Sequence, residues 1–415
     1  MEIRNTLVKN GGMVFIGFLF SIFLFTEPTI ADSTRGIKDK NVTIGVIAPL
    51  SRLAAHAGKG TVDAFQTYFK YINEEKGGIH GRKLELVIGD NQYEPSRSLA
   101  EFKKLVSRDN VMAIISFGTP TTTILVEPAM EEKVPVIALA GAPMLIKPPK
   151  RYIICMTEPY EIQATAVVVY IVSKIGDQKP RIGLFYNNDD LGRTAKAGVE
   201  AAAQYYGFKI LTEAPHIAGS PIDKAAVTKF KAEGVKYVLV GSHSGDVSSL
   251  LLEMKSQGLD CDVYGLVSPA SDRKIVEQAG DAAARYHSVA GEGQWFDKNP
   301  GVARMIEISK KYAPPEVLEA KSLYYGTSWY IANFVVEGLQ RSGRGLTVEK
   351  FLDALNTFKD WDTGGLAPPI TINQKRRVAI INSIIIKADL KTRTLLPISD
   401  WVELPEEIVN KFLGQ

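Results

Sequence analysis

The sequence predicts an α/β protein built from two doubly wound, Rossmann-like lobes. From about residue 41 onward, short β-branched runs alternate with amphipathic stretches, the pattern of βαβ units that share a parallel sheet. The alternation restarts near residue 160, which indicates a second sheet of the same kind. The length of 415 residues suits two or three domains. Ligands of such sheets are expected at the carboxyl ends of the strands.

The first predicted sheet has four strands, and amphipathic helices separate them. In the helix after the first strand, apolar residues recur at helical spacing at Val62, Phe65, Phe69 and Ile72, and Gly77 follows its end. The strands are expected at 42–49, 83–89, 111–116 and 134–139, and the helices at 58–75, 95–108 and 121–132.

The second predicted sheet repeats this order, and helices follow it. Its strands are expected at 181–186, 208–214, 236–241 and 262–267, and its helices at 162–175, 191–206, 222–233, 245–257 and 272–279. Beyond residue 290, helices are expected at 301–312, 322–341 and 347–356, before strand-like runs return within 377–404.

The N-terminus has the three parts of a cleavable signal peptide. Arg4 and Lys9 precede an apolar run at 13–25, and a short polar stretch ends at Ala31, where cleavage is expected. A membrane anchor is the alternative, but the run is shorter than the roughly 20 residues that a spanning helix needs. No cysteine lies near the end of this run, so no lipid anchor is expected there. Residues 1–31 therefore predict a periplasmic protein that diffuses freely.

Composition argues against a nucleic-acid partner. The formal net charge is +3 and no cluster of Lys and Arg occurs, so no nucleic-acid partner is expected.

Cys155 and Cys261 are the two cysteines of the chain. They could pair in an oxidising compartment, but their separation along the chain favours two unpaired thiols.

Catalytic motifs are missing from the sequence. The five histidines form no HxxxH or HxH pair, two cysteines cannot hold a metal alone, and no phosphate-binding GxxxxGK[ST] occurs. The stretch 241–245 resembles a nucleophile elbow, but His243 stands where the serine should be. Residues 188–190 suit a helix cap and a solvated turn better than a cation site. No enzymatic activity, cofactor or metal is expected.

Several segments in order carry a resemblance to a known family. They are residues 44–51 with Ala54 and Gly58, 71–73, 77–86, Asp90, Pro95, 118–121, 134–137 and 188–192. The ordered set resembles the periplasmic leucine/isoleucine/valine-binding protein family, the type I solute-binding proteins of branched-chain amino-acid-type ABC importers. Within it, the Gly-Thr-Pro-Thr form at 118–121 looks like a subgroup whose transporters are linked to aromatic or other organic acids.

This resemblance implies the type I periplasmic binding protein fold, in which a three-strand hinge joins the lobes. The crossings are expected near 155–160, 287–292 and 365–372. Lobe one then comprises 41–157 plus 290–367, and lobe two 158–289 plus 368–415. The resemblance further implies a monomer that captures a small-molecule ligand by hinge closure and delivers it to the membrane permease of an ABC importer. A ligand-sensing periplasmic receptor coupled to a signalling protein is the alternative.

The loop at 116–122 is predicted to bind the ligand. It lies between the carboxyl end of a strand and the start of a helix, where free N–H groups and the helix dipole favour an anion. Gly118, Thr119, Thr121 and Thr122 are the candidates, and the threonine hydroxyls are expected to bond a carboxylate. A structural helix cap is the alternative interpretation.

Further contacts in lobe one are expected where the resemblance places them. Ala140, Gly141 and Ala142 match a second family contact, where small residues let a ligand approach the backbone. Ser51 and His56 lie in the first strand–helix loop, although His56 equally suits a solvated position. Tyr324 and Tyr325 open a long helix, and Tyr325 is the predicted contact, with helix packing as its alternative role.

Lobe two departs from the family pattern. Members that bind amino acids place a carboxylate after the strand at 262–266, whereas this chain has no acid there until Asp272. A buried ammonium without a partner is unfavourable. A standard amino acid is therefore disfavoured unless Asp190, Asp246 or Asp272 takes the role, and a non-amino organic or aromatic acid is expected. Its predicted contacts in this lobe are Leu191, His243 and Ser268.

Overall fold

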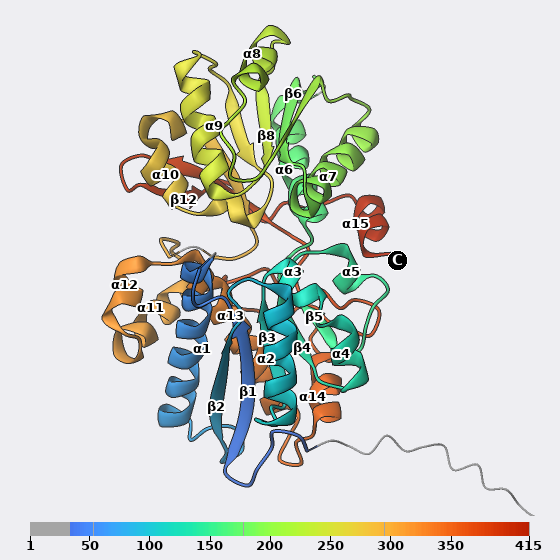
Figure 1. The fold of residues 1–415 in the computed structure, drawn as a ribbon, viewed down its shortest axis with the longest axis vertical. Coiled ribbons are helices and arrows are strands. Elements are labelled where there is room, and N and C mark those ends of the chain that lie inside the picture. The colour runs from blue at the N-terminus through green and yellow to red at the C-terminus, as the bar shows by residue number, and fades with distance from the viewer. Residues whose placement is uncertain (1–33, 53, 177, 294, 415) are drawn as a thin grey trace, which may run out of the picture. The chain divides into compact units, whose positions relative to one another are not determined.

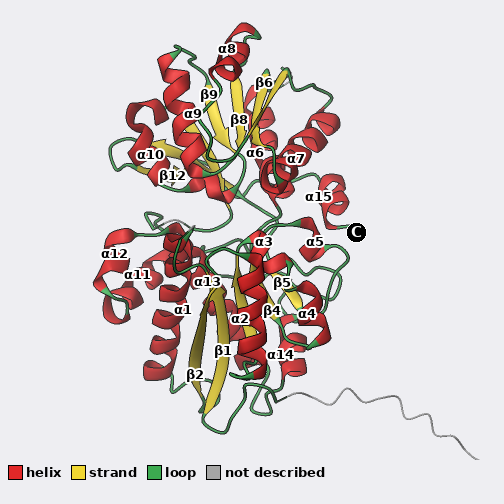
Figure 2. Ribbon diagram, viewed as in Figure 1, coloured by secondary structure: helices red, strands yellow, loops and turns green. Residues whose placement is uncertain are grey.

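The computed structural model describes residues 34–52, 54–176, 178–293 and 295–414. Two separate sheets organise these residues, and helices flank each of them (Figures 1 and 2). The predicted signal peptide at 1–31 lies outside the described residues. Among the described residues, no helix combines the length and the apolar character that crossing a membrane requires.

The first sheet is fully parallel and has the strand order β2-β1-β3-β4-β5. Its strands are β1 (Asn41–Ala48), β2 (Lys83–Asp90), β3 (Ala113–Phe117), β4 (Val136–Leu139) and β5 (Ile153–Cys155). The four predicted strands are confirmed, whereas β5 was not predicted, because three residues are too short a run to stand out from the sequence.

Five helices follow the strands of this sheet: α1 (Ala55–Glu75), α2 (Pro95–Ser107), α3 (Thr119–Thr123), α4 (Val126–Glu131) and α5 (Pro143–Ile146). The single helix predicted at 121–132 is wrong, because the chain forms α3 and α4 separately. Pro128 is the third residue of α4, where its missing N–H removes no helical hydrogen bond. In one continuous helix, the same proline would lie in the interior, where it is strongly unfavourable.

The second sheet has the order β12-β11-β10-β9-β8-β6-β7. Its strands are β6 (Ile182–Asn187), β7 (Thr212–His216), β8 (Tyr237–Gly241), β9 (Asp262–Gly265), β10 (Tyr286–Ala290), β11 (Ile384–Asp389) and β12 (Thr394–Pro397). The pairs from β7 to β10 are parallel, and β11 and β12 are antiparallel additions. Strand β7 lies a few residues later than predicted and contains Pro215, which an edge strand tolerates.

The helices of this sheet are α6 (Tyr160–Ile175), α7 (Asp190–Tyr206), α8 (Lys224–Ala232), α9 (Ser244–Ser256) and α10 (Lys274–Ala279), with short turns of 3-10 helix at Ser268–Ser271 and Gly280–Ala283. In each sheet, the first five strands in chain order are arranged 2-1-3-4-5. This is a doubly wound arrangement, whose strand order reverses at β1/β3 and at β6/β8 and leaves a crevice at the carboxyl ends.

The later helices return to the first sheet. They are α11 (Pro300–Tyr312), α12 (Pro315–Ala320), α13 (Leu323–Arg341) and α14 (Val348–Leu355), while α15 (Glu406–Leu413) ends the described chain. Helix α13 packs along α1 (Figure 1), and its residues share one hydrophobic core with those of β1. A second core fills the space between the second sheet and its helices.

The chain passes between the sheets after β5 and after β10, near the first two predicted crossings. The last passage differs from the prediction. Val378 forms a bridge with Cys155 of β5, and Ile370 and Ala379 belong to the core of the first sheet. Since β11 of the second sheet begins at Ile384, the last passage lies between these points and not at 365–372. The division into lobes that move as units stays a prediction.

Candidate functional site

A cavity of about 490 Å³ lies where the carboxyl ends of both sets of strands meet. Its lining comes from the segments that follow β1, β2, β3, β4 and β5 on one side, those that follow β7, β8, β9 and β10 on the other, and α13. The described residues that line it are Ala54, His56, Tyr93, Phe117, Gly118, Thr119, Leu139, Ala140, Thr157, Tyr160, Ala218, Gly219, His243, Ser244, Gly245, Asp246, Ser268, Pro269, Glu292, Leu323, Tyr324 and Thr327. This volume suits a small molecule.

Gly118 and Thr119 form the turn between β3 and α3 and face this cavity. Gly118 has a φ of 94°, and a Cβ there would lie 2.6 Å from Cε2 of Tyr93. Only glycine suits this position, because both the backbone conformation and the nearby ring exclude a side chain. The Thr119 hydroxyl lies 3.5 Å from the Tyr160 hydroxyl, at the edge of hydrogen-bonding distance.

Thr121 and Thr122 do not line the cavity. Both side chains are fully buried. The Thr121 hydroxyl donates to the carbonyls of Phe117 and Gly118, at 2.5 and 3.0 Å, and the Thr122 hydroxyl lies 2.8 Å from that of Ser116. These hydroxyls hold the turn in shape, and Thr119 is the one threonine of the turn that the structure brings to the cavity.

Aromatic side chains form much of the wall. Tyr324 packs edge-on against Phe117 and against His56, with ring centroids 5.5 Å apart in each pair. Tyr93 and Tyr160 add two further rings. Burial raises the pKa of the Tyr93, Tyr160 and Tyr324 hydroxyls, so these side chains stay neutral and can donate hydrogen bonds.

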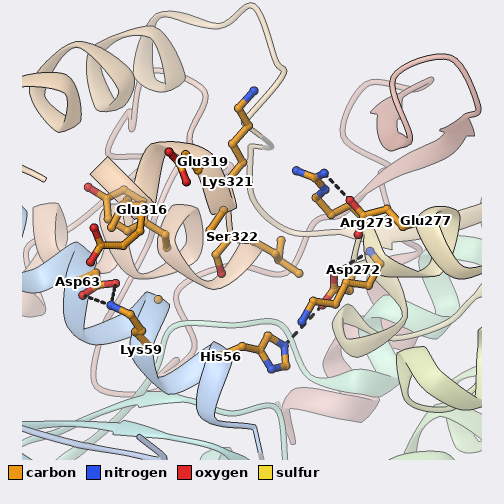
Figure 3. A pocket seen from close by; sticks show the side chains of 16 residues that line it. His56, Lys59, Asp63, Asp272, Arg273, Glu277, Glu316, Glu319, Lys321 and Ser322 are labelled. Atoms are coloured by element: carbon orange, nitrogen blue, oxygen red, sulfur yellow. Dashed lines mark hydrogen bonds and ion pairs between the residues drawn. The ribbon is translucent and has the colours of Figure 1, made fainter. Parts of the chain in front are cut away.

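His56 also forms part of the rim of the cavity, where it meets Asp272. The His56 Nε2 atom lies 3.6 Å from Asp272 Oδ2, so the start of α1 contacts the segment after β9 (Figure 3). Beyond this pair lies a second cavity of about 410 Å³, lined largely by charged side chains that include Lys59, Glu316 and Lys321. That cavity shares His56 with the first and has a much more polar lining.

The second sheet contributes His243, Asp246 and Ser268 to the lining. Asp246 is buried and accepts hydrogen bonds from the Ser242 hydroxyl and from the Gly219 amide, both at 3.0 Å. Gln163 of α6 fixes Ser268, because it accepts from the Ser268 amide at 2.8 Å and donates to the Ser268 hydroxyl at 2.7 Å.

Glu292 is the second acid of the lining. It follows β10, is buried, and accepts a hydrogen bond of 2.9 Å from the Thr327 hydroxyl. Burial raises the pKa of Glu292 to about 7. Among the described residues that line the cavity, none is a lysine or arginine, so the charged groups of its wall are acidic apart from any protonated histidine.

Five other predicted contacts do not line the cavity. They are Ser51, Gly141, Ala142, Leu191 and Tyr325. The Ser51 hydroxyl donates to Asp90 at 2.7 Å. Leu191 packs against the core of the second sheet. Tyr325 is buried, stacks on Trp329, and its hydroxyl lies 2.7 Å from that of Ser309, so it packs in α13 and lines the second cavity. Its neighbour Tyr324 faces the first cavity instead.

The structure therefore brings together six of the predicted contacts: His56, Gly118, Thr119, Ala140, His243 and Ser268. The sequence analysis missed Tyr93, Tyr160, Glu292 and Thr327. Tyr93 and Tyr160 each lie shortly after the carboxyl end of a strand, a signal that could have identified them. Thr327 lies within a buried stretch of α13 and carries no such signal.

Among the described residues, the structure shows neither a candidate metal site nor a disulfide. Within the described ranges, no group of three or more His, Cys, Asp or Glu side chains could hold a metal ion. Cys155 and Cys261 are both unpaired and buried, as predicted.

Comparison with known proteins agrees with this architecture. The model of the periplasmic binding protein family matches residues 41–391. An amino acid binding protein of Pseudomonas aeruginosa is 25% identical over 55% of this chain, and the match covers 60% of that protein. A Leu/Ile/Val-binding protein homolog of Brucella melitensis is 25% identical over 79% of this chain and 89% of its own length.

Among solved structures, a fatty acid ABC transporter substrate-binding protein from Thermomonospora curvata has a TM-score of 0.78 at 24% identity, covering 91% of this chain and 95% of that one. The predicted type I periplasmic binding protein fold is thereby confirmed, and so is the predicted resemblance to the leucine/isoleucine/valine-binding proteins. The chain belongs to the periplasmic binding protein family.

Proposed function

We propose that this protein is the periplasmic solute-binding component of an ABC importer, and that it captures a small carboxylate-bearing molecule with an apolar or aromatic body. One observation carries the proposal: loops at the carboxyl ends of strands of both sheets line a single cavity. A ligand there contacts both lobes at once, so its contacts are complete only when the lobes are closed.

The carboxylate end is assigned to the turn at Gly118 and Thr119. Thr119 lines the cavity and carries a hydroxyl that can donate to a carboxylate, whereas the Gly118 amide already donates to the Leu139 carbonyl at 3.1 Å. Helix α3 spans five residues, so its dipole adds little, and the Thr119 hydroxyl is the proposed donor to the carboxylate. Ala140, after the neighbouring strand β4, lies beside them in the lining.

The rings of Tyr93, Phe117, Tyr160 and Tyr324 suit an apolar body. The names of similar proteins support this class of ligand. Relatives named for leucine, isoleucine and valine, and a structural neighbour named for fatty acids, share one ligand chemistry, a carboxylate on a hydrocarbon body.

An amino group on the ligand is compatible with this cavity. The prediction of a non-amino acid rested on the missing carboxylate after β9, but Asp246 and Glu292 place two other buried acids in the lining. An ammonium group would therefore find a partner, and both amino acids and their deaminated analogues belong among the candidate ligands.

The remaining parts of the proposal follow from this role. The chain is exported by the signal peptide at residues 1–31, acts in the periplasm without catalysing a reaction, and in its closed form docks as a monomer on a membrane permease. Export rests on the N-terminal pattern of residues 1–31, and docking on the permease rests on the ligand-dependent closure.

Thermal unfolding with a panel of ligands tests the proposal. The panel contains amino acids, aromatic acids, aliphatic acids, dicarboxylates, and the amide of each acid. A ligand at about 100 times its Kd adds roughly 2.7 kcal/mol of stability, which shifts Tm by several degrees. We expect at least one carboxylate to raise Tm, and its amide to raise it less. If amides and acids act equally, or if no member of the panel acts, the proposal is wrong.

A further inference from the structure

Two carboxylic acids lie together beneath the cavity, at the passages of the chain between the sheets. Glu158 follows β5 on the first passage, and Glu292 follows β10 on the second. Their side chains are 0% and 3% exposed. Neither residue is used by the proposed binding of the carboxylate end, and neither was a predicted contact.

The contacts of Glu158 join all three passages. A Cβ on Gly291 would lie only 1.8 Å from Oε1 of Glu158, so this carboxyl group rests directly on the backbone of the residue before Glu292. The Ser383 hydroxyl, just before β11, donates to the same Oε1 atom at 3.1 Å. One side chain thus touches the second and third passages while it belongs to the first.

The surroundings of the two acids are polar but not basic. Gln163 donates to Glu158 Oε2 at 3.3 Å, and Thr327 donates to Glu292. The titratable side chains that also face them are Tyr324, which interacts with Glu292, and Tyr330, which interacts with both acids. No lysine or arginine is among the described groups that shift the pKa of either carboxyl.

Two negative charges at this depth repel each other, and burial disfavours the ionised form of both groups, so the pair keeps a proton near neutral pH. The direction of both pKa shifts agrees with this geometry. Burial, together with the charge of Glu292, raises the pKa of Glu158 to about 8, and burial raises the pKa of Glu292 to about 7.

The pair is also connected to the ligand cavity by hydrogen bonds. Glu292 and its partner Thr327 both line the cavity. Gln163, which donates to Glu158, also donates to the Ser268 hydroxyl, and Ser268 is a further lining residue. A change of charge at Glu292 therefore alters its electrostatic interaction with a bound molecule and with the passages that join the sheets.

We propose that Glu292 and Glu158 form a proton-linked recognition site, in which Glu292 accepts a cationic nitrogen of the ligand and the pair then releases the proton that it holds in the empty protein. The inference rests on the proposed function, since it needs a ligand in this cavity. The positive charge replaces the proton as the partner of the second carboxylate, the proton leaves to the solvent, and no covalent bond of the ligand changes.

Matched pairs of ligands test this site. The probes are L-phenylalanine with hydrocinnamate and L-leucine with isocaproate, which differ by the amino group alone. Calorimetric titrations near neutral pH in phosphate and in Tris give the number of protons released from the dependence of the binding enthalpy on the buffer. We expect one amino-bearing probe to bind about tenfold or more tightly than its partner and to release a substantial fraction of a proton, roughly half or more.

Three variants separate recognition from general structure. E292Q keeps the shape of the side chain and should bring the affinity ratio of the pair to within about threefold of one, and E158Q should abolish proton release. E161Q is the matched control, because Glu161 is also buried and the pKa of its carboxyl is also raised by burial, yet it does not line the cavity. E161Q should keep both the ratio and the proton release.

Each contrary result has a distinct meaning. If neither member of either pair binds, the proposed function is wrong for these ligand classes and the inference falls with it. If the deaminated partners bind as tightly to the native protein, or the amino-bearing probes bind without releasing a proton, the inference alone is wrong. The measurement on the native protein decides this even if E292Q folds poorly.

Discussion

His56 Nε2 lies 3.6 Å from Asp272 Oδ2, and this pair connects the start of α1 to the segment after β9. Burial raises the pKa of Asp272, but the hydrogen bonds from His56 and from the Lys274 amide outweigh that effect, so the pKa is lowered overall. Asp272 is therefore held as a carboxylate that can attract His56. Since the two residues belong to different lobes of the proposed hinge, we expect their contact to break when the lobes open.

Replacing His56 by glutamine is therefore expected to weaken ligand binding modestly. The His56 side chain is half exposed, so the pair contributes no more than about 1 kcal/mol, and Kd should rise by up to about fivefold. K59Q is the matched control, because Lys59 lies on the same helix and pairs with Asp63 within that helix. Titration calorimetry measures both variants, and an equal loss of affinity in K59Q would exclude a specific role for the contact between the lobes.

Replacing Thr119 by valine should reduce the affinity for the carboxylate more strongly. A hydrogen bond to a charged group contributes about 1.5–3 kcal/mol, so Kd should rise by roughly 10- to 100-fold. T123V is the control, since Thr123 is in the same short helix but does not line the cavity. Binding that stays unchanged in T119V would place the carboxylate elsewhere in the cavity.

The position of the turn at Gly118 and Thr119 could be predicted from the sequence, but the hydroxyl groups that reach the cavity could not. A glycine and three threonines between a buried strand and a helix indicate a polar turn at the carboxyl edge of the sheet. Which hydroxyls face the cavity depends on the angle at which α3 leaves β3. The Thr121 hydroxyl turns back to the carbonyl of Phe117, and no local pattern distinguishes it from Thr119.

The order of strands and helices could be predicted wherever burial follows a regular apolar pattern. Strand β10 was missed because it contains His287 and Ser288, two polar residues. Both are buried, and their partners are distant in sequence: the His287 ring stacks on Tyr264 at 4.4 Å, and the Ser288 hydroxyl lies 3.0 Å from that of Ser271. Glu292 was missed for the same reason, since its burial depends on tertiary contacts.

Replacing Gly118 by alanine should destabilise the protein and impair binding together. The positive φ is unfavourable for alanine, and the new Cβ would collide with the Tyr93 ring, so we expect a loss of more than about 1 kcal/mol in the free energy of unfolding. G245A is the control, because Gly245 also lines the cavity but has open space at its Cβ position. Urea unfolding distinguishes them, and equal stabilities would show that the turn relaxes freely.

The two cysteines should be unreactive in the folded protein. Burial raises the pKa of the Cys155 thiol to about 12 and that of the Cys261 thiol to about 11, so neither forms the reactive thiolate at neutral pH. A coloured disulfide reagent should label neither thiol in the native protein and both after denaturation. Failure to label them after denaturation would mean that they form a disulfide in the exported protein.

The buried acid pair should make stability depend on pH in an unusual direction. The pKa of Glu158 is raised in the folded protein from its usual 4.5 to about 8, so over this interval the folded state binds more protons than the unfolded state. The contribution of Glu158 is therefore present at low pH and is lost as the pH rises through about 8. E158Q cannot ionise, and its free energy of unfolding should fall less than that of the native protein between about pH 5 and about pH 8, by more than about 1 kcal/mol. Urea unfolding across this range measures the difference. E131Q, at an exposed glutamate, is the control and should follow the native curve.

Parallel curves for E158Q and the native protein would contradict this prediction. They would mean that Glu158 is ionised in both the folded and the unfolded protein, because a carboxylate with the same charge in both states contributes no pH dependence.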